Sequence, residues 1–265
     1  RGGAQPVRGL SAVLFTPDDL QLPRAAPQQR RRLLDRAIVT VWPAYQALLR
    51  DYAKVLGHRN RTLRDKRARS PLLSVYDEQL AAFGAKILLT RQRYLEGIAP
   101  RFSESYRRIA QSGVTAVLRY ETAPELGEAG GQLSALAQRL GALLRRDLDR
   151  ALARGQTGVG PHTDDLAFLL DGRPARQFAS QGQLRAMVLA FRVTQIVDTR
   201  ERLGQDPILL LDDVSSELDA RRNSYLFEFL EEISCQRFVS TTRPELLPTG
   251  GELKKFHIVN GTIRA

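Results

Sequence analysis

The run PILLL at residues 207–211, followed directly by two aspartates, is the feature that most constrains the fold of this chain. An uninterrupted apolar run of this length predicts a buried strand of a parallel sheet. Open α/β sheets bind ligands at the carboxyl ends of their strands, which is where Asp212 and Asp213 would lie. We therefore expect Asp212 to help hold Mg²⁺ and Asp213 to orient or deprotonate an attacking water. The plainer interpretation is a buried strand that leads to an ordinary helix capped by Asp219.

A second candidate site is the segment Ser180-Gln181-Gly182-Gln183, which opens a helix predicted to run from about residue 181 to 203. Gly182 permits a close approach of the backbone to a ligand, and the free N–H groups and dipole of a helix N-terminus favour a phosphate. We expect these four residues to contribute to a phosphate site. The alternative is an ordinary serine cap before an amphipathic helix.

The remaining patterns predict an α/β chain with a mainly helical middle, from about residue 28 to 155. The simplest arrangement is a helical insertion between two pieces of one α/β domain. The helices are expected at 28–41, from Pro43 onward, at 74–95, at 101–111 after Gly97 and Pro100, and at 132–154. Strands are expected at 10–15, 114–120 and 237–241, with hairpins around Asp171-Gly172 and Asn260-Gly261.

Positive charge is concentrated in one third of the chain. The formal net charge is +11, and residues 24–108 alone carry 19 Lys and Arg against 7 Asp and Glu. Such a field attracts polyanions, of which nucleic acid is the commonest in the cytosol. The alternative is a solvated, arginine-rich helical surface. The residues that we expect to contact DNA are Arg31, Arg32, Arg59, Arg61, Arg64, Lys66 and Arg67.

Several classes of protein are disfavoured by the composition. No apolar run approaches the roughly 18 residues of a membrane-spanning helix, so we expect no membrane partner. The single cysteine, Cys235, excludes an intrachain disulfide and a cysteine-based zinc site. A lone thiol suits a reducing cytosol, so we expect a cytoplasmic protein, associated with the nucleoid if it binds DNA.

Five segments between residues 13 and 247 together resemble the RecF family of recombination mediators, in the ABC class of ATPases. The strand with Asp212 and Asp213 resembles a Walker B motif, and SSELD after it, which ends at Asp219, resembles the ABC D-loop. Residues 178–193 resemble the ABC signature motif. The other three are FTPDDL with the arginine-rich run that follows it, GPHTDDL at 160–166, and RFVSTTR at 237–243. Thr163 stands where the family has an arginine, and His162 and Asp164 have either a direct or a structural role.

The resemblance implies a partial ABC-type ATPase head of the P-loop NTPase kind, with a mainly α-helical arm. Residues 1–40, with a Q-loop-like segment, and 158–265 would form the head, and residues 41–157 the arm. It implies ATP and Mg²⁺ as cofactors and an ATP-dependent homodimer, in which Ser180–Gln183 of one subunit contacts the ATP of the other. Thr242 would hydrogen-bond the γ-phosphate. The family binds double-stranded DNA or double-strand/single-strand junctions, has RecR and RecO as partners, and helps load a recombinase at gaps.

A phosphate-binding loop of the form GxxxxGK[ST] does not occur in the 265 residues. The family carries it near its N-terminus, and this sequence has no initial methionine. We therefore expect a fragment that lacks a quarter or more of the protein and has no ATPase activity alone, whereas the full-length protein would be a weak ATPase. One alternative is a DNA-binding scaffold that naturally lacks the loop. Another is an SMC or Rad50 relative, although about 150 residues are too few for a long coiled coil.

Overall fold

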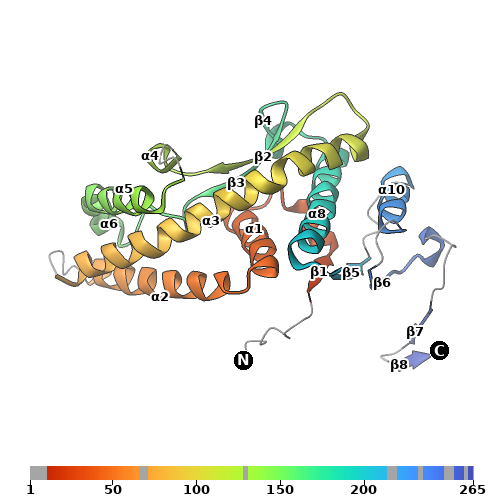
Figure 1. The fold of residues 1–265 in the computed structure, drawn as a ribbon, viewed down its shortest axis with the longest axis horizontal. Coiled ribbons are helices and arrows are strands. Elements are labelled where there is room, and N and C mark those ends of the chain that lie inside the picture. The colour runs from red at the N-terminus through yellow and green to blue at the C-terminus, as the bar shows by residue number, and fades with distance from the viewer. Residues whose placement is uncertain are drawn as a thin grey trace.

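The computed structural model describes residues 11–65, 71–127, 131–213, 220–231, 235–247, 254–259 and 262–264. Figure 1 shows a long helical arm on one side and, on the other, a small sheet with a long helix beside it. One continuous cluster of buried side chains extends through both sides, from Val13 on the sheet to Leu136 on the arm. The predicted α/β class with a largely helical insertion is confirmed.

The parallel sheet has the strand order β1-β5-β6, with the predicted apolar strand in the middle. The helix α8 (Gln181–Leu203) contacts β1, and alternate residues of β1 and β5 are buried. On the opposite face, Leu14 and Phe238 are 47% and 53% exposed, so in the described residues the apolar run of β5 is only half covered. The strands are β1 (Ala12–Phe15), β5 (Ile208–Asp212) and β6 (Arg237–Ser240).

Helix α1 (Pro27–Val41) leads to the arm. The helices of the arm are α2 (Tyr45–Arg64), α3 (Pro71–Ala110), α4 (Pro124–Gly127), α5 (Leu133–Arg146) and α6 (Leu148–Arg154). The predicted interruption at Gly97 and Pro100 is wrong, because α3 continues through both. A helical proline removes one hydrogen bond and costs about 3 kcal/mol, which is less than burial of a side-chain face provides. That face continues on both sides of Pro100, with Ile98 and Phe102 both fully buried.

The single helix predicted for 132–154 is divided at Asp147. This residue ends α5 and also precedes the first residue of α6, with φ −87° and ψ 6°. Aspartate is a frequent residue at helix ends because its side chain competes with helical hydrogen bonding. The predicted end of the helix at Gly155 is confirmed, and this glycine has a left-handed φ of 65°.

The second sheet has the antiparallel order β2-β3-β4 and joins the arm to the rest of the chain. The predicted hairpin is confirmed, with φ 46° at Asp171 and 77° at Gly172, as a two-residue turn with both central residues left-handed requires. Phe168 of β3 lies 6.1 Å from Phe102 of α3 and 6.3 Å from Phe191 of α8, centroid to centroid. The elements are β2 (Ala116–Glu121), β3 (Asp165–Leu170), β4 (Arg173–Pro174) and α7 (Ala175–Phe178).

The other described elements include two short 3-10 helices, η1 (Pro17–Gln21) and η2 (Pro244–Leu246), and one further helix, α10 (Ala220–Glu231). The strands β7 (His257–Val259) and β8 (Thr262–Arg264) form a terminal hairpin. The predicted terminal hairpin is confirmed by the antiparallel pairing of its strands, although Asn260 and Gly261 lie outside the described residues. None of the helices described has the length and apolar character to cross a membrane.

Candidate functional site

The carboxyl ends of β5 and β6 lie side by side and carry the two aspartates singled out above. The backbone N–H of Asp213 donates to the carbonyl of Ser240 at 2.9 Å. The Ser240 hydroxyl donates to Asp212 Oδ1 at 2.6 Å, so it fixes one oxygen of an exposed carboxylate. Asp213 has a φ of 47°, an uncommon backbone conformation for a residue other than glycine. Strain of this kind is concentrated at functional sites, where the surrounding structure maintains it.

Thr242 contacts the same carboxylate from the other strand end. Its backbone N–H donates to Asp213 Oδ1 at 3.3 Å, and its Oγ1 lies 3.5 Å from each carboxylate oxygen of Asp213. The two residues predicted to act on the attacking water and the terminal phosphate are thus adjacent, although 29 positions separate them in the chain. The juxtaposition follows from the pairing of Asp212 with Ser240 in the sheet.

The residue at this edge that would hold a magnesium ion is Asp212. In the described part of the chain, no group of three or more His, Cys, Asp or Glu residues is placed to hold a metal. Mg²⁺ usually keeps several waters and binds through one or two carboxylates together with substrate phosphates. The exposed Asp212 carboxylate fits that mode of binding.

The Ser180–Gln183 segment begins α8 as predicted and forms a reciprocal capping arrangement. The Gln183 N–H donates to Ser180 Oγ at 3.2 Å, and the Ser180 N–H donates to Gln183 Oε1 at 2.8 Å. The ordinary capping interpretation is therefore correct as far as these two side chains are concerned. A Cβ on Gly182 would lie 3.0 Å from Nη2 of Arg222, so a guanidinium from α10 packs closely against this turn. Asp219 lies outside the described residues.

The GPHTDDL segment is built into a buried polar network around Arg91. Arg91 donates from Nε and Nη2 to the two carboxylate oxygens of Asp35, each at 2.9 Å. Its Nη1 donates to the carbonyl of Pro161 at 2.6 Å and to the hydroxyl of Tyr120 at 3.1 Å. The Tyr120 hydroxyl donates in turn to Asp164 Oδ2 at 2.6 Å, and burial raises the pKa of Asp164 to about 6. Asp164 therefore joins α3, β2 and this loop, in keeping with a structural role.

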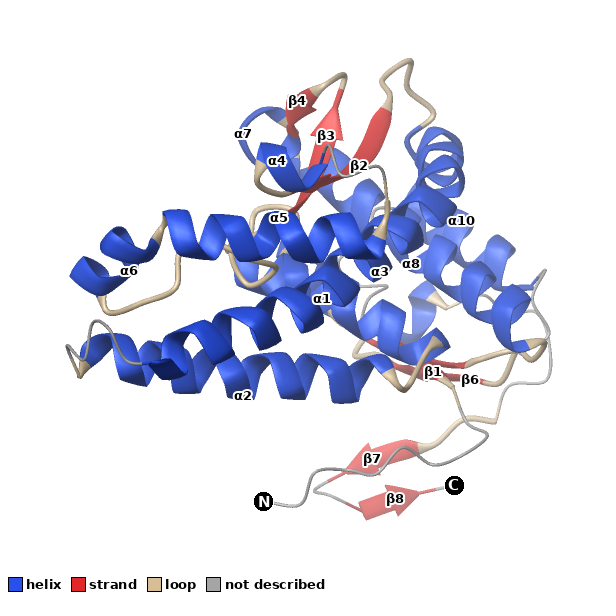
Figure 2. Cartoon of the chain, turned by 60° about the vertical axis from the view of Figure 1, so that its left-hand side comes forward, coloured by secondary structure: helices blue, strands red, loops and turns tan. Residues whose placement is uncertain are grey.

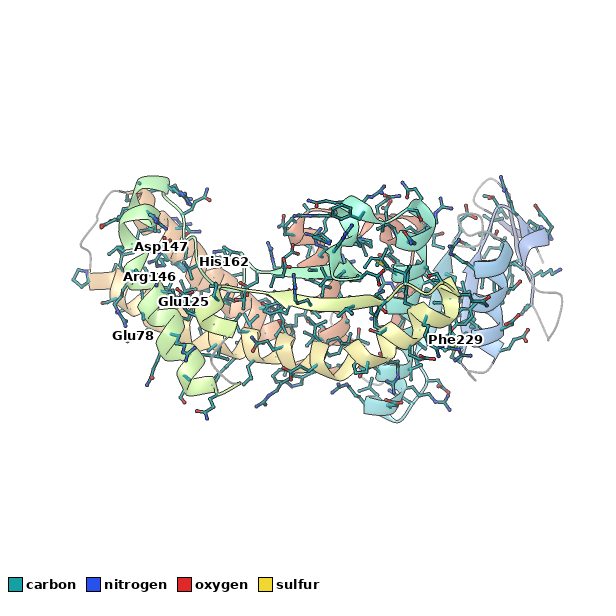
Figure 3. The ribbon with its side chains drawn as sticks, turned by 90° about the horizontal axis from the view of Figure 1, so that it is seen from above. Glu78, Glu125, Arg146, Asp147, His162 and Phe229 are labelled. Atoms are coloured by element: carbon teal, nitrogen blue, oxygen red, sulfur yellow. The ribbon has the colours of Figure 1, made fainter. Side chains whose placement is uncertain are left out.

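His162 is also held on both ring nitrogens. Nε2 lies 3.0 Å from the carbonyl of Thr157, which can only accept, so this nitrogen carries the proton. Nδ1 then accepts from the hydroxyl of Tyr52 at 2.7 Å. Burial lowers the pKa of His162, which favours this neutral form. Figure 3 labels His162 where the loop passes from the arm toward β3, and its contacts favour a structural role over a direct one.

Thr163, at the position where the resemblance implies an arginine, closes a turn. Its hydroxyl and its backbone N–H both donate to the carbonyl of Gly160 at 2.8 Å. Gly160 has a φ of 127°, a conformation that side chains disfavour. The threonine hydroxyl is thus engaged within the loop.

The residues expected to contact DNA differ in their surroundings. Arg32, Arg61 and Arg64 are exposed, whereas Lys66 and Arg67 lie outside the described residues. Arg31 is half-buried, and its Nη1 donates to the carbonyl of Asp164 at 2.5 Å. Burial lowers the pKa of Arg31.

The prediction that Arg59 contacts DNA is wrong, because this residue is 0% exposed and cannot reach a phosphate. It donates to Asp77 Oδ1 at 2.6 Å and to the hydroxyl of Thr157 at 2.9 Å, so it ties α2 to α3 and to the loop. The sequence spacing explains the burial of Arg59, because this residue lies on the same face of α2 as the buried Tyr52 and Val55.

Two ion pairs connect these elements and were not predicted. Arg30 of α1 donates from Nε to Asp165 Oδ1 of β3 at 2.9 Å. Arg192 of α8 pairs with Asp19 of η1 at 2.7 Å, with both side chains largely buried. The position of Arg192 inside the apolar run MVLAFRV was the available signal, because a buried charge requires a partner.

The relatives found by comparison with known proteins agree with one another. No family model matches the chain. The chain is 43% identical over 260 residues to the DNA replication and repair protein RecF of Anaeromyxobacter sp. strain Fw109-5, covering 96% of this chain and 68% of that protein. It is 42% identical over 241 residues to that of Myxococcus xanthus strain DK1622, covering 90% and 63%.

Solved structures agree with these relatives. A structure of the recombination mediator protein RecF with ATP, in the RecFOR pathway, superimposes with a TM-score of 0.82 at 29% identity. The match covers 96% of this chain and 67% of that chain, and a structure with ATPrS gives the same values. The chain therefore spans about two thirds of the length of the relatives that it matches.

Proposed function

The chain belongs to the RecF family of DNA replication and repair proteins, and we propose that it carries the hydrolytic and dimer-contacting residues of an ATP-dependent DNA clamp. The observation that carries the proposal is the meeting of Asp213 with Thr242 at the carboxyl ends of two adjacent parallel strands. The edge of an open α/β sheet is where such folds bind nucleotides. The two RecF structures that resemble this chain are complexes with ATP and with ATPrS.

Each residue at this edge has a definite chemical capacity. The Asp213 carboxylate can orient a water and accept its proton as the oxygen attacks the terminal phosphorus. The Thr242 hydroxyl can donate to a phosphate oxygen but cannot serve as a base near neutral pH. When bound, Mg²⁺ would neutralise charge on the phosphates, and Asp212 is the residue that would hold it. Thr242 also donates to Asp213, so it keeps the carboxylate directed toward the strand ends.

The proposed clamp is a homodimer closed by ATP. Ser180–Gln183 of one subunit would contact the ATP of the other, with Asp219 at the same boundary, and hydrolysis would reopen the dimer. Residues 1–40 and 158–265 would form the head, and 41–157 the arm. We further propose that the clamp binds double-stranded DNA or double-strand/single-strand junctions at the nucleoid. It would act there with RecR- and RecO-type partners to help load a recombinase at gaps. The support is membership of the family and the net charge of +11.

A binding measurement tests the nucleotide part of the proposal. The 265 residues contain no GxxxxGK[ST] loop, whose backbone amides and lysine cradle the phosphates. A fluorescent ATP analogue is titrated into the chain alone and into the chain with the loop-bearing segment of a RecF protein joined ahead of Arg1. The control carries alanine in place of the loop lysine.

The proposal predicts tight binding only with the intact loop. Tight binding by the chain alone would contradict it. If neither protein binds the analogue while DNA binding persists, the chain acts as a DNA-binding scaffold instead.

A further inference from the structure

The outward face of α2 carries a line of unpaired cations. The buried residues of this helix include Tyr52, Val55 and Leu63. Successive residues of a helix are about 100° apart, and on this basis four basic residues lie roughly opposite the buried side. They follow one another at intervals of four, seven and three residues. These residues, which we name the α2 stripe, are Arg50, Lys54, Arg61 and Arg64, and all four are exposed.

Among the described elements, the end of α6 approaches this face at Arg64, where Gly155 packs against the arginine stem. In Figures 1 and 2, α2 forms an outer edge of the arm, with the other arm helices on one side of it. Asp51 and Asp65 lie beside the stripe rather than in it, and the position in its middle is Gly57. A Cβ at Gly57 would have nothing within 4 Å, so the backbone itself is accessible at the centre of the stripe.

The four cations of the stripe have no acidic partners in the described part of the chain and, unlike other unpaired arginines such as Arg93 and Arg150, they are aligned along one face of a single helix. Among the described residues, none of its four members forms an ion pair. Some exposed arginines elsewhere are matched, and Figure 3 shows one such pair, Glu125 and Arg146, on the arm. The other matched pairs include Arg101–Glu201, Arg107–Glu104 and Arg119–Glu121. The positive field along α2 is therefore uncompensated.

The geometry points to the backbone of double-stranded DNA as the partner of the α2 stripe, an inference that rests on the proposed DNA-binding function. Fourteen residues of helix place the outer members about 21 Å apart on a straight ridge, which can follow a line of phosphates. Sequence-independent binding of this kind needs arginine and lysine alone. A surface that binds single-stranded DNA usually has aromatic side chains on which the bases stack. A surface that binds a protein usually has a central apolar or aromatic anchor. The stripe contains neither type of residue.

Salt-dependent DNA binding tests this inference on the intact 265-residue chain. The test variant replaces Arg50, Lys54, Arg61 and Arg64 with glutamine. The matched control replaces four exposed cations on other helices, Lys86, Arg93, Arg145 and Arg150, with glutamine, so that the net charge falls equally. Binding to a duplex of about 30 base pairs is measured over a series of KCl concentrations, and thermal melting shows that both variants fold.

Each phosphate contact contributes about −0.9 to the slope of log K against log salt. We expect the test variant to reduce the magnitude of the slope by about 3.6 units, while the control changes it by less than one. Equal effects in both variants, or an unchanged slope in the test variant, would overturn the assignment of the stripe and leave the DNA-binding function intact. Failure of the unaltered chain to bind duplex DNA would overturn the function itself, and the stripe with it.

Two further outcomes would reassign the face. If the test variant weakens binding of single-stranded DNA but not of duplex, the duplex assignment is wrong. If it leaves DNA binding unchanged but weakens binding of poly-glutamate, the stripe is a surface for an acidic protein.

Discussion

Arg91 and Asp35 form a two-armed ion pair, with Nε–Oδ1 and Nη2–Oδ2 distances of 2.9 Å each, that joins the longest helix of the arm to α1. The Tyr45 hydroxyl also donates to Asp35 Oδ1 at 2.9 Å. Burial by itself opposes a charge on Arg91, yet the neighbouring Tyr120, Tyr45 and Asp35 raise the pKa of Arg91, so it stays charged. The guanidinium thus organises α1, α3, β2 and the GPHTDDL loop around one point.

Substitution of Arg91 by alanine is predicted to be strongly destabilising. It leaves the Asp35 carboxylate without its cation and removes a donor from the carbonyl of Pro161. Removing one partner of a buried pair costs about 3–5 kcal/mol. Urea unfolding measures the change, and the control is Arg93→Ala, an exposed arginine of the same helix whose loss should cost no more than about 0.5 kcal/mol. Similar losses for both variants would show that the network contributes little.

The buried carboxylate of Asp164 is predicted to make stability fall as the pH rises. Burial raises the pKa of Asp164 from 3.8 to about 6. Between these values the folded chain holds more protons than the unfolded chain, so the free energy of unfolding decreases with pH in that window. In an Asp164→Asn variant the side chain would carry no charge, and its carbonyl could still accept from Tyr120.

The comparison of Asp164→Asn with the unaltered chain isolates this effect. The variant should have equal stability near pH 4 and become relatively more stable up to about pH 6, by no more than about 1.4 kcal/mol per pH unit. Unfolding is measured in urea at pH 4, 5, 6 and 7. A stability difference that does not change with pH would contradict the prediction.

Two helical glycines are predicted to respond in opposite directions to substitution by alanine. At Gly57, where a Cβ meets nothing within 4 Å, alanine should stabilise the chain by up to about 1 kcal/mol through its helix propensity. At Gly84 a Cβ would lie 2.5 Å from Cδ2 of Leu140, where α3 packs against α5, and overpacking costs about 1–3 kcal/mol. Thermal melting of the two variants checks the sign of each change. Stabilisation by Gly84→Ala would show that the two helices separate readily.

Local signals predicted the elements whose ends depend on one or two residues. The start of α8 at Ser180, its end at Gly204 and the turn at Asp171-Gly172 all depend on side-chain capping or on left-handed backbone. The break expected at Pro100 failed because the packing of distant residues decides whether a helix continues. The meeting of Asp213 with Thr242 could be expected from the order of the strands, but their hydrogen bonds could not.

The sequence also could not show which charged residues are buried or which of them form ion pairs. Composition identified the basic third of the chain correctly, yet it could not separate the buried Arg59 from the exposed Arg61. That separation depends on which face of α2 meets α3, a tertiary relationship. The partners Asp19, Asp77 and Asp165 lie between 18 and 173 positions away from the arginines that they neutralise, so no short motif contains both members of a pair.

Hydrolysis of ATP by the Asp213→Asn variant tests the central claim most directly. The substitution is made in the chain to which the phosphate-binding loop of a RecF protein has been joined. Asparagine is chosen because it can keep both the left-handed backbone of residue 213 and the hydrogen bond from Thr242. It cannot take a proton from water, so we predict a rate about 10²- to 10⁴-fold lower with unchanged ATP binding, whereas Asp65→Asn on the arm has no effect. An Asp213→Asn protein that hydrolyses ATP at the unaltered rate would contradict the account.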